Sequence, residues 1–399
     1  MFSFFQARKL RYEIHVQRDD RWQIKEVVDD ERDSLKRKFD RLDFQALEAE
    51  VIQRAKDVLR DPRIQAVKVL RERSRPDGFT TTQEIFSEAP TSKPAETFAI
   101  GEYKGAVELC TTVEQLYERP SCRVIGFVLR SYLERFTLTP LELLHHYSYI
   151  RKLEQNYQLR NAAVHHIAAR QGGPEAAGLK ARIDVLEKLL GAASSIAKAV
   201  WQESGRLKLA GDDIEALNRA VTGSFSGAAA KFRIGLALSD ALLGTGFDGK
   251  VAALLRWRDR TEDPLLCRFL DEFVAGCIDS PQFVTSLIGG QGNLSGALRA
   301  LADLSRGQLP AKGRGPSEIA APLVARIKKQ EFPATEAAIW ERILREFERR
   351  TPLTHEDKAG EWNEVKRLSL FFDSVAPIAI RKSFLDAAQI RYQRLRQAG

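Results

Sequence analysis

A glycine-rich segment, Gly244-Thr-Gly-Phe-Asp-Gly-Lys250, has the spacing GxxxxGK with which nucleotide-binding proteins place backbone amides around phosphate groups. That chemistry also needs a Ser or Thr after the lysine to hold Mg²⁺, and Val251 stands there instead. A phosphate loop follows a buried strand, whereas residues 232–243 have the pattern of a helix. The sequence therefore predicts a glycine loop between two helices rather than a nucleotide site.

A second glycine-rich segment, residues 283–296, imitates a strand that leads into a dinucleotide-binding turn. Its glycines Gly290, Gly292 and Gly296 are spaced one residue wider than GxGxxG. A dinucleotide-binding fold also needs a parallel sheet, and no second strand with an acidic end follows. We therefore expect no cofactor at these glycines.

The histidines that could bind a metal form two pairs, His145-His146 and His165-His166. Four imidazoles would suit a metal ion if the two segments packed together, but no carboxylate or cysteine stands at ligand spacing beside them. Adjacent residues of a helix point about 100° apart, so each pair would offer one ligand to a given site. Ordinary histidines on helix surfaces are the simplest interpretation, and a phosphoacceptor histidine packed against residues 179–201 is the alternative.

Two shorter patterns are also poor candidates. Ser195-Ile-Ala-Lys198 matches the SxxK of some serine nucleophiles, but it lies inside a long helical pattern and not at an exposed helix start. Arg256-Trp257-Arg258 alternates cations with an aromatic ring, yet a base-stacking surface needs several aromatic residues on one face. We therefore predict no catalytic, cofactor-binding or metal-ligating residues.

The composition limits the class of protein and its partners. A chain of 399 residues with 44% hydrophobic and 29% charged residues is long enough for two or three globular domains. Its net charge of +8 permits contact with nucleic acid, an anionic surface or an acidic partner, without demanding one, because acidic residues are interleaved with the basic ones.

The cysteines and the N-terminus bear on the cellular compartment. Cys110 and Cys122, and likewise Cys267 and Cys277, stand among apolar residues at spacings that make no CxxC motif, so we expect buried, reduced thiols. No run approaches the ~18 apolar residues of a membrane-spanning helix. Residues 1–5 are apolar and the basic residues follow them, the reverse of a secretory signal. We therefore expect a cytoplasmic protein.

Residues 1–87 are predicted to form a small α+β module. Leu10, Tyr12, Ile14 and Val16 alternate with polar residues, as in a half-buried strand whose polar face would leave His15 in solvent. A second strand at 22–28 completes a hairpin, a helix over 46–59 follows, and strands at 64–73 and 79–86 form a second hairpin around a turn at 75–78. The predicted order is ββαββ, with one face of the sheet covered by helix.

The rest of the chain is predicted to be a large all-α region of roughly a dozen helices. A proline-bearing linker over 88–101 precedes it, although Phe98, Ile100 and Tyr103 are apolar enough to pack against the helices. Residues 102–306 form a helical domain, and a Gly/Pro/basic stretch at 307–316 opens a C-terminal subdomain, 307–399, which is separate or continuous with it. Capping patterns predict helix starts at Thr139, Asp212, Ser280 and Thr354.

Two helices carry patterns that suggest contacts. Apolar residues from Leu179 to Val200 recur at alternating steps of four and three, a heptad seam for antiparallel packing within the chain or for a homo-oligomer. The last helix, over 384–395, has basic residues that complement the helix dipole or contact an anion: Arg381, Lys382, Arg391, Arg394 and Arg396.

These observations favour a non-catalytic intracellular adaptor or regulatory protein that acts through protein–protein contacts. The two-part layout and the lack of a defensible catalytic motif support that hypothesis. An enzyme whose site is assembled from scattered residues of the helical region is one alternative, and it would have a deep pocket with convergent polar groups. A protein that binds nucleic acid electrostatically is the other, and its affinity would fall steeply with salt.

Overall fold

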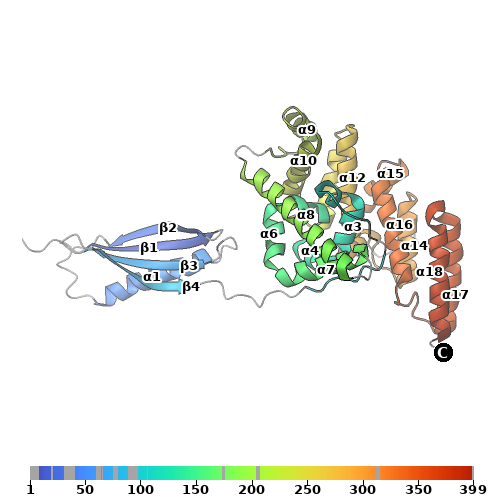
Figure 1. Ribbon diagram of the computed structural model, residues 1–399, viewed down its shortest axis with the longest axis horizontal. Helices are drawn as coiled ribbons and strands as arrows, with labels where there is room; N and C mark the ends of the chain where they lie inside the picture. Colours follow the sequence, from blue (N-terminus) through green and yellow to red (C-terminus); the bar gives the residue numbers. More distant parts are fainter. Residues whose placement is uncertain are drawn as a thin grey trace, which may run out of the picture. The chain divides into compact units, whose positions relative to one another are not determined.

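The computed structural model describes residues 9–18, 21–30, 41–59, 64, 66–74, 80–88, 98–105, 107–172, 176–203, 207–310 and 315–397. Two compact units divide the chain, Met1–Thr97 and Phe98–Gly399. The first contains a four-stranded sheet and a helix, and the second consists of helices and their connections (Figure 1). The predicted fold class, mainly α with a small N-terminal α+β module, is confirmed.

The sheet of the first unit is antiparallel throughout, with the strand order β2-β1-β3-β4. The predicted order ββαββ is confirmed, and both hairpins share one sheet. The elements are β1 (Lys9–Arg18), β2 (Arg21–Asp30), α1 (Arg41–Leu59), β3 (Ala66–Ser74) and β4 (Thr80–Glu88). The predicted turn at 75–78 and the apolar residues 1–5 lie outside the described residues.

The core of this unit follows from the alternation along β1. Tyr12, Ile14 and Val16 are buried and pack in one cluster with Val51 and Ala55 of α1. Successive side chains of a strand point to opposite faces, so the helix covers the face that carries these three residues. The prediction that one face is covered by helix is therefore confirmed.

The other face of β1 is less solvated than its polar residues suggest. The Nε2 atom of His15 lies 2.9 Å from Oε2 of Glu13, and the Glu13 side chain is buried. β1 is an inner strand with a neighbour on each side, and the adjoining side chains shield its polar face. The prediction that His15 is simply solvated is therefore wrong.

The second unit contains seventeen helices among its described residues, more than the dozen predicted. The excess comes from short helices that follow one another without a glycine or proline between them. The helices are α2 (Val113–Leu116), α3 (Arg119–Val128), α4 (Arg130–Phe136), α5 (Pro140–His145), α6 (Tyr147–Gln155), α7 (Tyr157–Gly172), α8 (Ala176–Gln202), α9 (Ile214–Thr222), α10 (Gly227–Leu242), α11 (Phe247–Arg258), α12 (Pro264–Ile278), α13 (Pro281–Ile288), α14 (Leu294–Ser305), α15 (Ala320–Lys328), α16 (Pro333–Glu348), α17 (Lys358–Val375) and α18 (Ile378–Gln397).

Two of the four predicted caps begin a helix, and the other two lie within three residues of the residue that caps a helix. Thr139 accepts a hydrogen bond from the Glu142 amide, and the Glu142 carboxylate accepts one from the Thr139 amide, which is a complete capping box at α5. Ser280 caps α13 in the same way without the reciprocal bond. At α9 and α17 the capping residues are Asp213 and Asp357, each within three residues of the predicted start.

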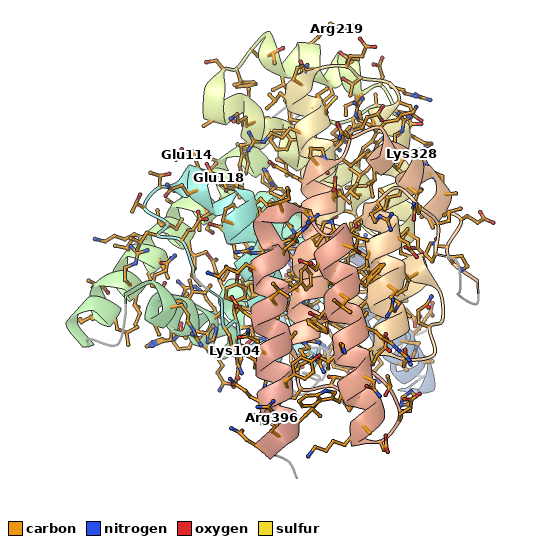
Figure 2. All side chains as sticks on the ribbon, turned by 90° about the vertical axis from the view of Figure 1, so that its right-hand side faces the viewer. Lys104, Glu114, Glu118, Arg219, Lys328 and Arg396 are labelled. Carbon is orange, nitrogen blue, oxygen red and sulfur yellow. The ribbon has the colours of Figure 1, made fainter. Side chains whose placement is uncertain are left out.

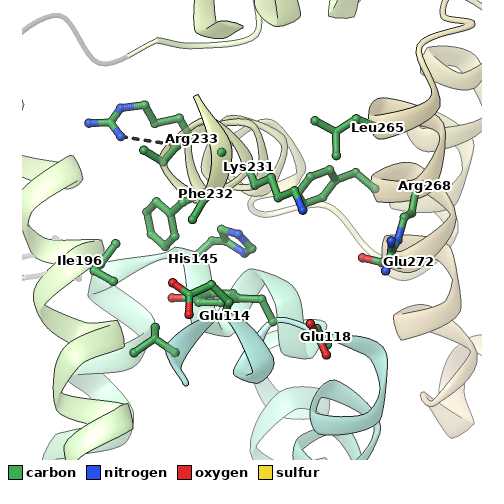
Figure 3. Close-up of a pocket in the computed structure, with 16 residues that line it drawn as sticks. Glu114, Glu118, His145, Ile196, Lys231, Phe232, Arg233, Leu265, Arg268 and Glu272 are labelled. Atoms are coloured by element: carbon green, nitrogen blue, oxygen red, sulfur yellow. Dashed lines mark hydrogen bonds and ion pairs between the residues drawn. The ribbon is translucent and has the colours of Figure 1, made fainter. Parts of the chain in front are cut away.

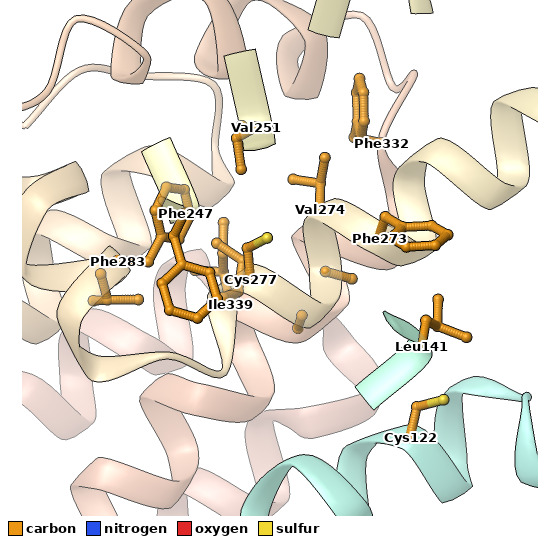
Figure 4. Close-up of a cluster of buried hydrophobic side chains, with 14 of the residues drawn as sticks. Cys122, Leu141, Phe247, Val251, Phe273, Val274, Cys277, Phe283, Phe332 and Ile339 are labelled. Atoms are coloured by element: carbon orange, nitrogen blue, oxygen red, sulfur yellow. The ribbon is translucent and has the colours of Figure 1, made fainter. Parts of the chain in front are cut away.

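One hydrophobic cluster runs through the second unit from Tyr103 to Ala388. At its centre, α12 contributes Phe273, Val274 and Cys277, with Phe247 of α11 and Ile339 of α16 nearby (Figure 4). Because α16 packs against α12 and α14, the helices after residue 307 share the core of those before it. Contact clustering accordingly places residues 98–399 in one compact unit.

The segment after Thr97 belongs to the helical unit. The ring centroid of Phe98 lies 5.3 Å from that of Tyr132, and the Gly101 amide donates to the Val128 carbonyl at 2.9 Å. Tyr103 is buried. At the other end of the predicted linker, Glu88 is the last residue of β4. The first residue of the predicted linker 88–101 thus belongs to β4, and its last four residues pack against the helices.

The heptad seam of α8 faces its own unit. Leu186 is buried in a cluster with Val164 and Ala168 of α7. Ala197 and Val200 are buried in another cluster that contains Ile150 of α6 and Phe232 of α10. These contacts correspond to the intrachain alternative for the seam, and they occupy the face that an oligomer would use.

Within the described ranges, no helix combines the length and the apolar character that crossing a membrane requires.

Candidate functional site

The first three residues of the GxxxxGK segment, 244–246, form the predicted inter-helix loop, and its last four begin α11. Helix α10 precedes it and α11 begins at Phe247, so the segment lacks the strand that a phosphate loop needs. Gly244 has a positive φ of 73°, which explains a glycine where α10 ends. Lys250 lies inside α11 and is buried. Its ammonium group is therefore directed into the protein and not toward a ligand in solution.

The partner of Lys250 is Glu142 of α5. The Lys250 Nζ atom lies 2.5 Å from Glu142 Oε1 and donates at the same distance to the Thr137 carbonyl. Glu142 is fully buried; burial raises the pKa of its carboxyl, and Lys250 opposes that shift. No sequence pattern predicts this pair, because its members stand on helices that are distant in the chain.

The glycines at 290, 292 and 296 do not follow a strand. Residues 281–288 form α13, and Gly289, with φ 69°, ends it. Asn293 then caps α14 by accepting from the Gly296 amide at 2.9 Å. The element that precedes these glycines is therefore a helix and not the strand that a dinucleotide-binding turn requires.

The histidines do not lie on helix surfaces as predicted. His145 and His146 are buried, and His166 Nε2 lies 3.1 Å from the Tyr103 carbonyl. His146 Nε2 lies 3.2 Å from Asp240 Oδ1. Only His165 matches the surface prediction. Helix periodicity alone could not show that a unit with so many helices would bury α5 on all sides.

A cavity of about 480 Å³ opens between α2, α5, α8, α10 and α12, and we call it the aromatic cavity (Figure 3). Its larger apolar side chains come from four different segments, so no local sequence pattern could predict it. Its lining includes the apolar residues Val113, Tyr117, Ile196, Phe232, Leu265 and Phe269 and the polar residues Glu114, Glu118, His145, Lys231, Arg233, Arg268 and Glu272.

His145 is packed between aromatic rings in the wall of this cavity. Its ring centroid lies 4.9 Å from that of Tyr117 and 5.0 Å from that of Phe232. Its Nδ1 atom lies 2.7 Å from the Leu141 carbonyl. A carbonyl only accepts hydrogen bonds, so Nδ1 carries the proton and Nε2 keeps its lone pair. Burial lowers the pKa of His145 to about 4, so the ring is neutral near pH 7.

Two further features define the interior of the aromatic cavity. A methyl group at Gly235 of α10 would overlap the Nε2 atom of His145, so the glycine permits the close approach of ring and helix. The Tyr117 hydroxyl is buried and has no hydrogen-bond partner in the described part of the chain. The cavity wall thus contains one uncommitted hydroxyl donor within an apolar environment.

The charged residues at the rim fall into two groups. Arg268 and Glu272 form an ion pair at 2.8 Å, and Arg233 pairs with Glu203 outside the cavity. Glu114 and Glu118 are exposed, and their carboxylates form no hydrogen bond or ion pair with described residues. Both lie on the same edge of the helical unit (Figure 2). Lys231, an exposed cation, also lines the cavity, and Arg268 interacts electrostatically with Glu118. That edge of the cavity therefore carries two carboxylates that have no ion-pair partner among the described residues.

The remaining candidates have structural roles. Ser195 lies within α8 and donates to the Gly191 carbonyl at 2.9 Å. Trp257 is buried and donates to Asp212 Oδ1 at 2.8 Å, so its ring is not available to stack on a base. All four cysteines are free; Cys267 alone is partly exposed, so the predicted burial holds for the other three.

Among the residues that the structure describes, no three histidine, cysteine or acidic side chains gather as metal ligands would. No family model, curated protein or solved structure matches the chain. The aromatic cavity is therefore the candidate site on its geometry alone. It offers a concave apolar surface, a hydroxyl donor and an acidic edge, which are features suited to binding.

Proposed function

We propose that the helical unit is a non-catalytic binding unit whose aromatic cavity receives an apolar side chain of a partner protein. One observation carries the proposal: an apolar cavity of about 480 Å³ is bordered by two carboxylates that have no ion-pair partner in the described part of the chain. Pockets of this size and lining bind small ligands or the anchor side chains of partners. The protein would then be an adaptor or regulatory protein, the function that the sequence favours.

The ionisable groups near the cavity support a binding role over catalysis. A general acid or base works best with a pKa near the operating pH, whereas the pKa of His145 is about 4. Its Nδ1 proton is also engaged by the Leu141 carbonyl. The nearby Glu142 is neutralised by Lys250 and holds the start of α5. His145 is thus part of the cavity wall, and the Glu142–Lys250 pair holds the helix that carries it.

The charge at the rim indicates which partner fits. An aromatic or long aliphatic side chain would fill the apolar interior, and a neighbouring Lys or Arg would reach Glu114 or Glu118. Both carboxylates are exposed, so a salt bridge with either adds modestly to affinity but selects the register of the bound segment. We therefore expect the partner to present a cation next to an apolar anchor.

The four free cysteines fit an intracellular setting, where thiols stay reduced. An intracellular location is thus part of the proposal. The small N-terminal module would supply a second contact or a regulatory input, as the two-unit layout suggests.

Selection of peptides from a random phage library on the full-length protein tests the proposal. Ala229→Trp should fill the aromatic cavity from the exposed face of α10 and abolish enrichment. Ala162→Trp, at an exposed position on α7, is the matched control and should retain it. Equal enrichment on both variants would show that peptides bind elsewhere.

A further inference from the structure

A second cavity, of about 440 Å³, lies at the end of α16 and beside α18. Four arginines line it, Arg349, Arg350, Arg391 and Arg394, together with one acidic residue, Glu361. We call it the arginine cavity. Two of these arginines belong to the basic group of the last helix, for which helix-dipole compensation and contact with an anion were the alternatives.

Arg391 and Glu361 form a hydrogen-bonded ion pair in the lining of the arginine cavity. Arg391 is buried, and its guanidinium donates to Glu361 Oε1 at 3.0 Å and to the Thr351 carbonyl at 3.0 Å. The other oxygen of Glu361 accepts from the amides of Leu353 and Thr354 at 2.8 and 3.1 Å. These bonds tie the segment after α16 to both α17 and α18. The charges of Arg391 and Glu361 oppose each other, and the network holds Thr351, the residue that follows Arg350.

The remaining positive charge of the cavity comes from its other three arginines. Arg349 is engaged by Glu346 at 2.7 Å. Arg394 donates one N–H to the Glu348 carbonyl at 2.8 Å, which directs its guanidinium and leaves other donors unused. Arg350 is exposed and forms no hydrogen bond or ion pair with described residues. The Glu348 carboxylate also interacts electrostatically with Arg394.

We propose that the arginine cavity binds a phosphate group carried by a larger molecule, with Arg350 and Arg394 as its ligands. A guanidinium presents a rigid fork of donors that matches two oxygens of a phosphate, which an ammonium group does not. The cavity exceeds the volume of a phosphate group alone, and Pro352 and Leu395 supply an apolar wall for the remainder of the ligand. The site is separate from the aromatic cavity and does not depend on the function proposed for it.

Calorimetric titration of the full-length protein with pyrophosphate tests this site. Arg350→Ala and Arg394→Ala should each weaken binding about tenfold, and the double variant should abolish it. Arg394→Lys keeps the positive charge but lacks the planar pair of N–H donors. It should therefore recover only part of the affinity that Arg394→Ala loses. Arg367→Ala removes an exposed arginine of α17 that does not line the cavity, and it should bind as the wild type does.

Co-sedimentation with phosphatidylcholine vesicles, with and without phosphatidic acid, distinguishes a lipid headgroup from a soluble phosphate. Sedimentation that needs both phosphatidic acid and the two arginines would assign the phosphate to a lipid, and pyrophosphate binding without sedimentation would assign it to a soluble ligand. Absence of binding in both assays, or an equal loss in Arg367→Ala, would overturn the proposal.

Discussion

The Nζ atom of Lys250 lies 2.5 Å from the Oε1 atom of Glu142, and both side chains are buried. The contact joins α11 to the capped start of α5, and α5 ends at His145 in the wall of the aromatic cavity. The lysine that gives the chain its resemblance to a phosphate loop thus helps to position the candidate site.

Removal of one member of this pair should be worse than removal of both charges. Lys250→Met would leave the Glu142 carboxylate buried without its counter-ion, so we expect a loss of about 3–5 kcal/mol in the free energy of unfolding. Adding Glu142→Gln removes the buried charge and keeps an acceptor for the cap, so the double variant should recover much of the loss. Urea denaturation measures both values, and an undiminished loss in the double variant would contradict the coupling.

His145 should make stability depend on pH. Its pKa is about 4 in the folded protein and near 6.5 when unfolded, so between these values the unfolded state binds the proton and the folded state does not. Stability attributable to this group is complete above pH 6.5 and falls on acidification toward pH 4, by roughly 3 kcal/mol in total. His145→Gln lacks this titration.

The difference in unfolding free energy between the wild type and His145→Gln isolates the histidine from carboxylates that titrate in the same range. We expect the difference to shrink as the pH falls through that window. A difference that stays constant with pH would mean that His145 keeps an ordinary pKa.

Gly235 should tolerate alanine only when His145 is shortened. The added methyl group would overlap His145 Nε2, and the hydrogen bond to Leu141 holds the ring in place. Gly235→Ala should therefore cost about 1–3 kcal/mol, as overpacking does. In a double-mutant cycle with His145→Ala, the alanine at 235 should cost much less. Additive costs would place the strain elsewhere.

Tyr117→Phe should leave the fold at least as stable as the wild type. The hydroxyl is buried without a partner among described residues, so its removal relieves a desolvation penalty of about 1–3 kcal/mol. Thermal unfolding of the two proteins compares them. A clear fall in Tm would reveal a hydrogen bond to this hydroxyl and would remove it as a donor available to a ligand.

The extent to which the sequence predicts the fold depends on how local the cause is. The alternation of Tyr12, Ile14 and Val16 and the capping box at Thr139 act within a few residues, and both were predicted correctly. The end of α3 and the start of α4 meet at Leu129, without a glycine or proline to mark the boundary. Boundaries of this kind explain the underestimated number of helices.

The candidate site was not predictable in the same way. Tyr117, His145 and Phe232 come from three separate segments. The local sequence around each of them is typical of an ordinary helix or turn. Their proximity follows from long-range packing of α5 against α10, for which the only local trace is the glycine at 235. At the two glycine-rich motifs, a helix stands where the corresponding chemistry requires a strand.

The proposed binding of a cation beside an apolar anchor is tested most directly by a charge-reversal cycle. Fluorescence anisotropy would measure a library-selected peptide, and the same peptide with its cation changed to Glu, against the wild type and against Glu114→Lys with Glu118→Lys. We predict that either reversal alone weakens binding about tenfold and that the two together restore a substantial part of it. Two reversals whose losses simply add, with no restoration, would contradict the proposed role of the acidic edge.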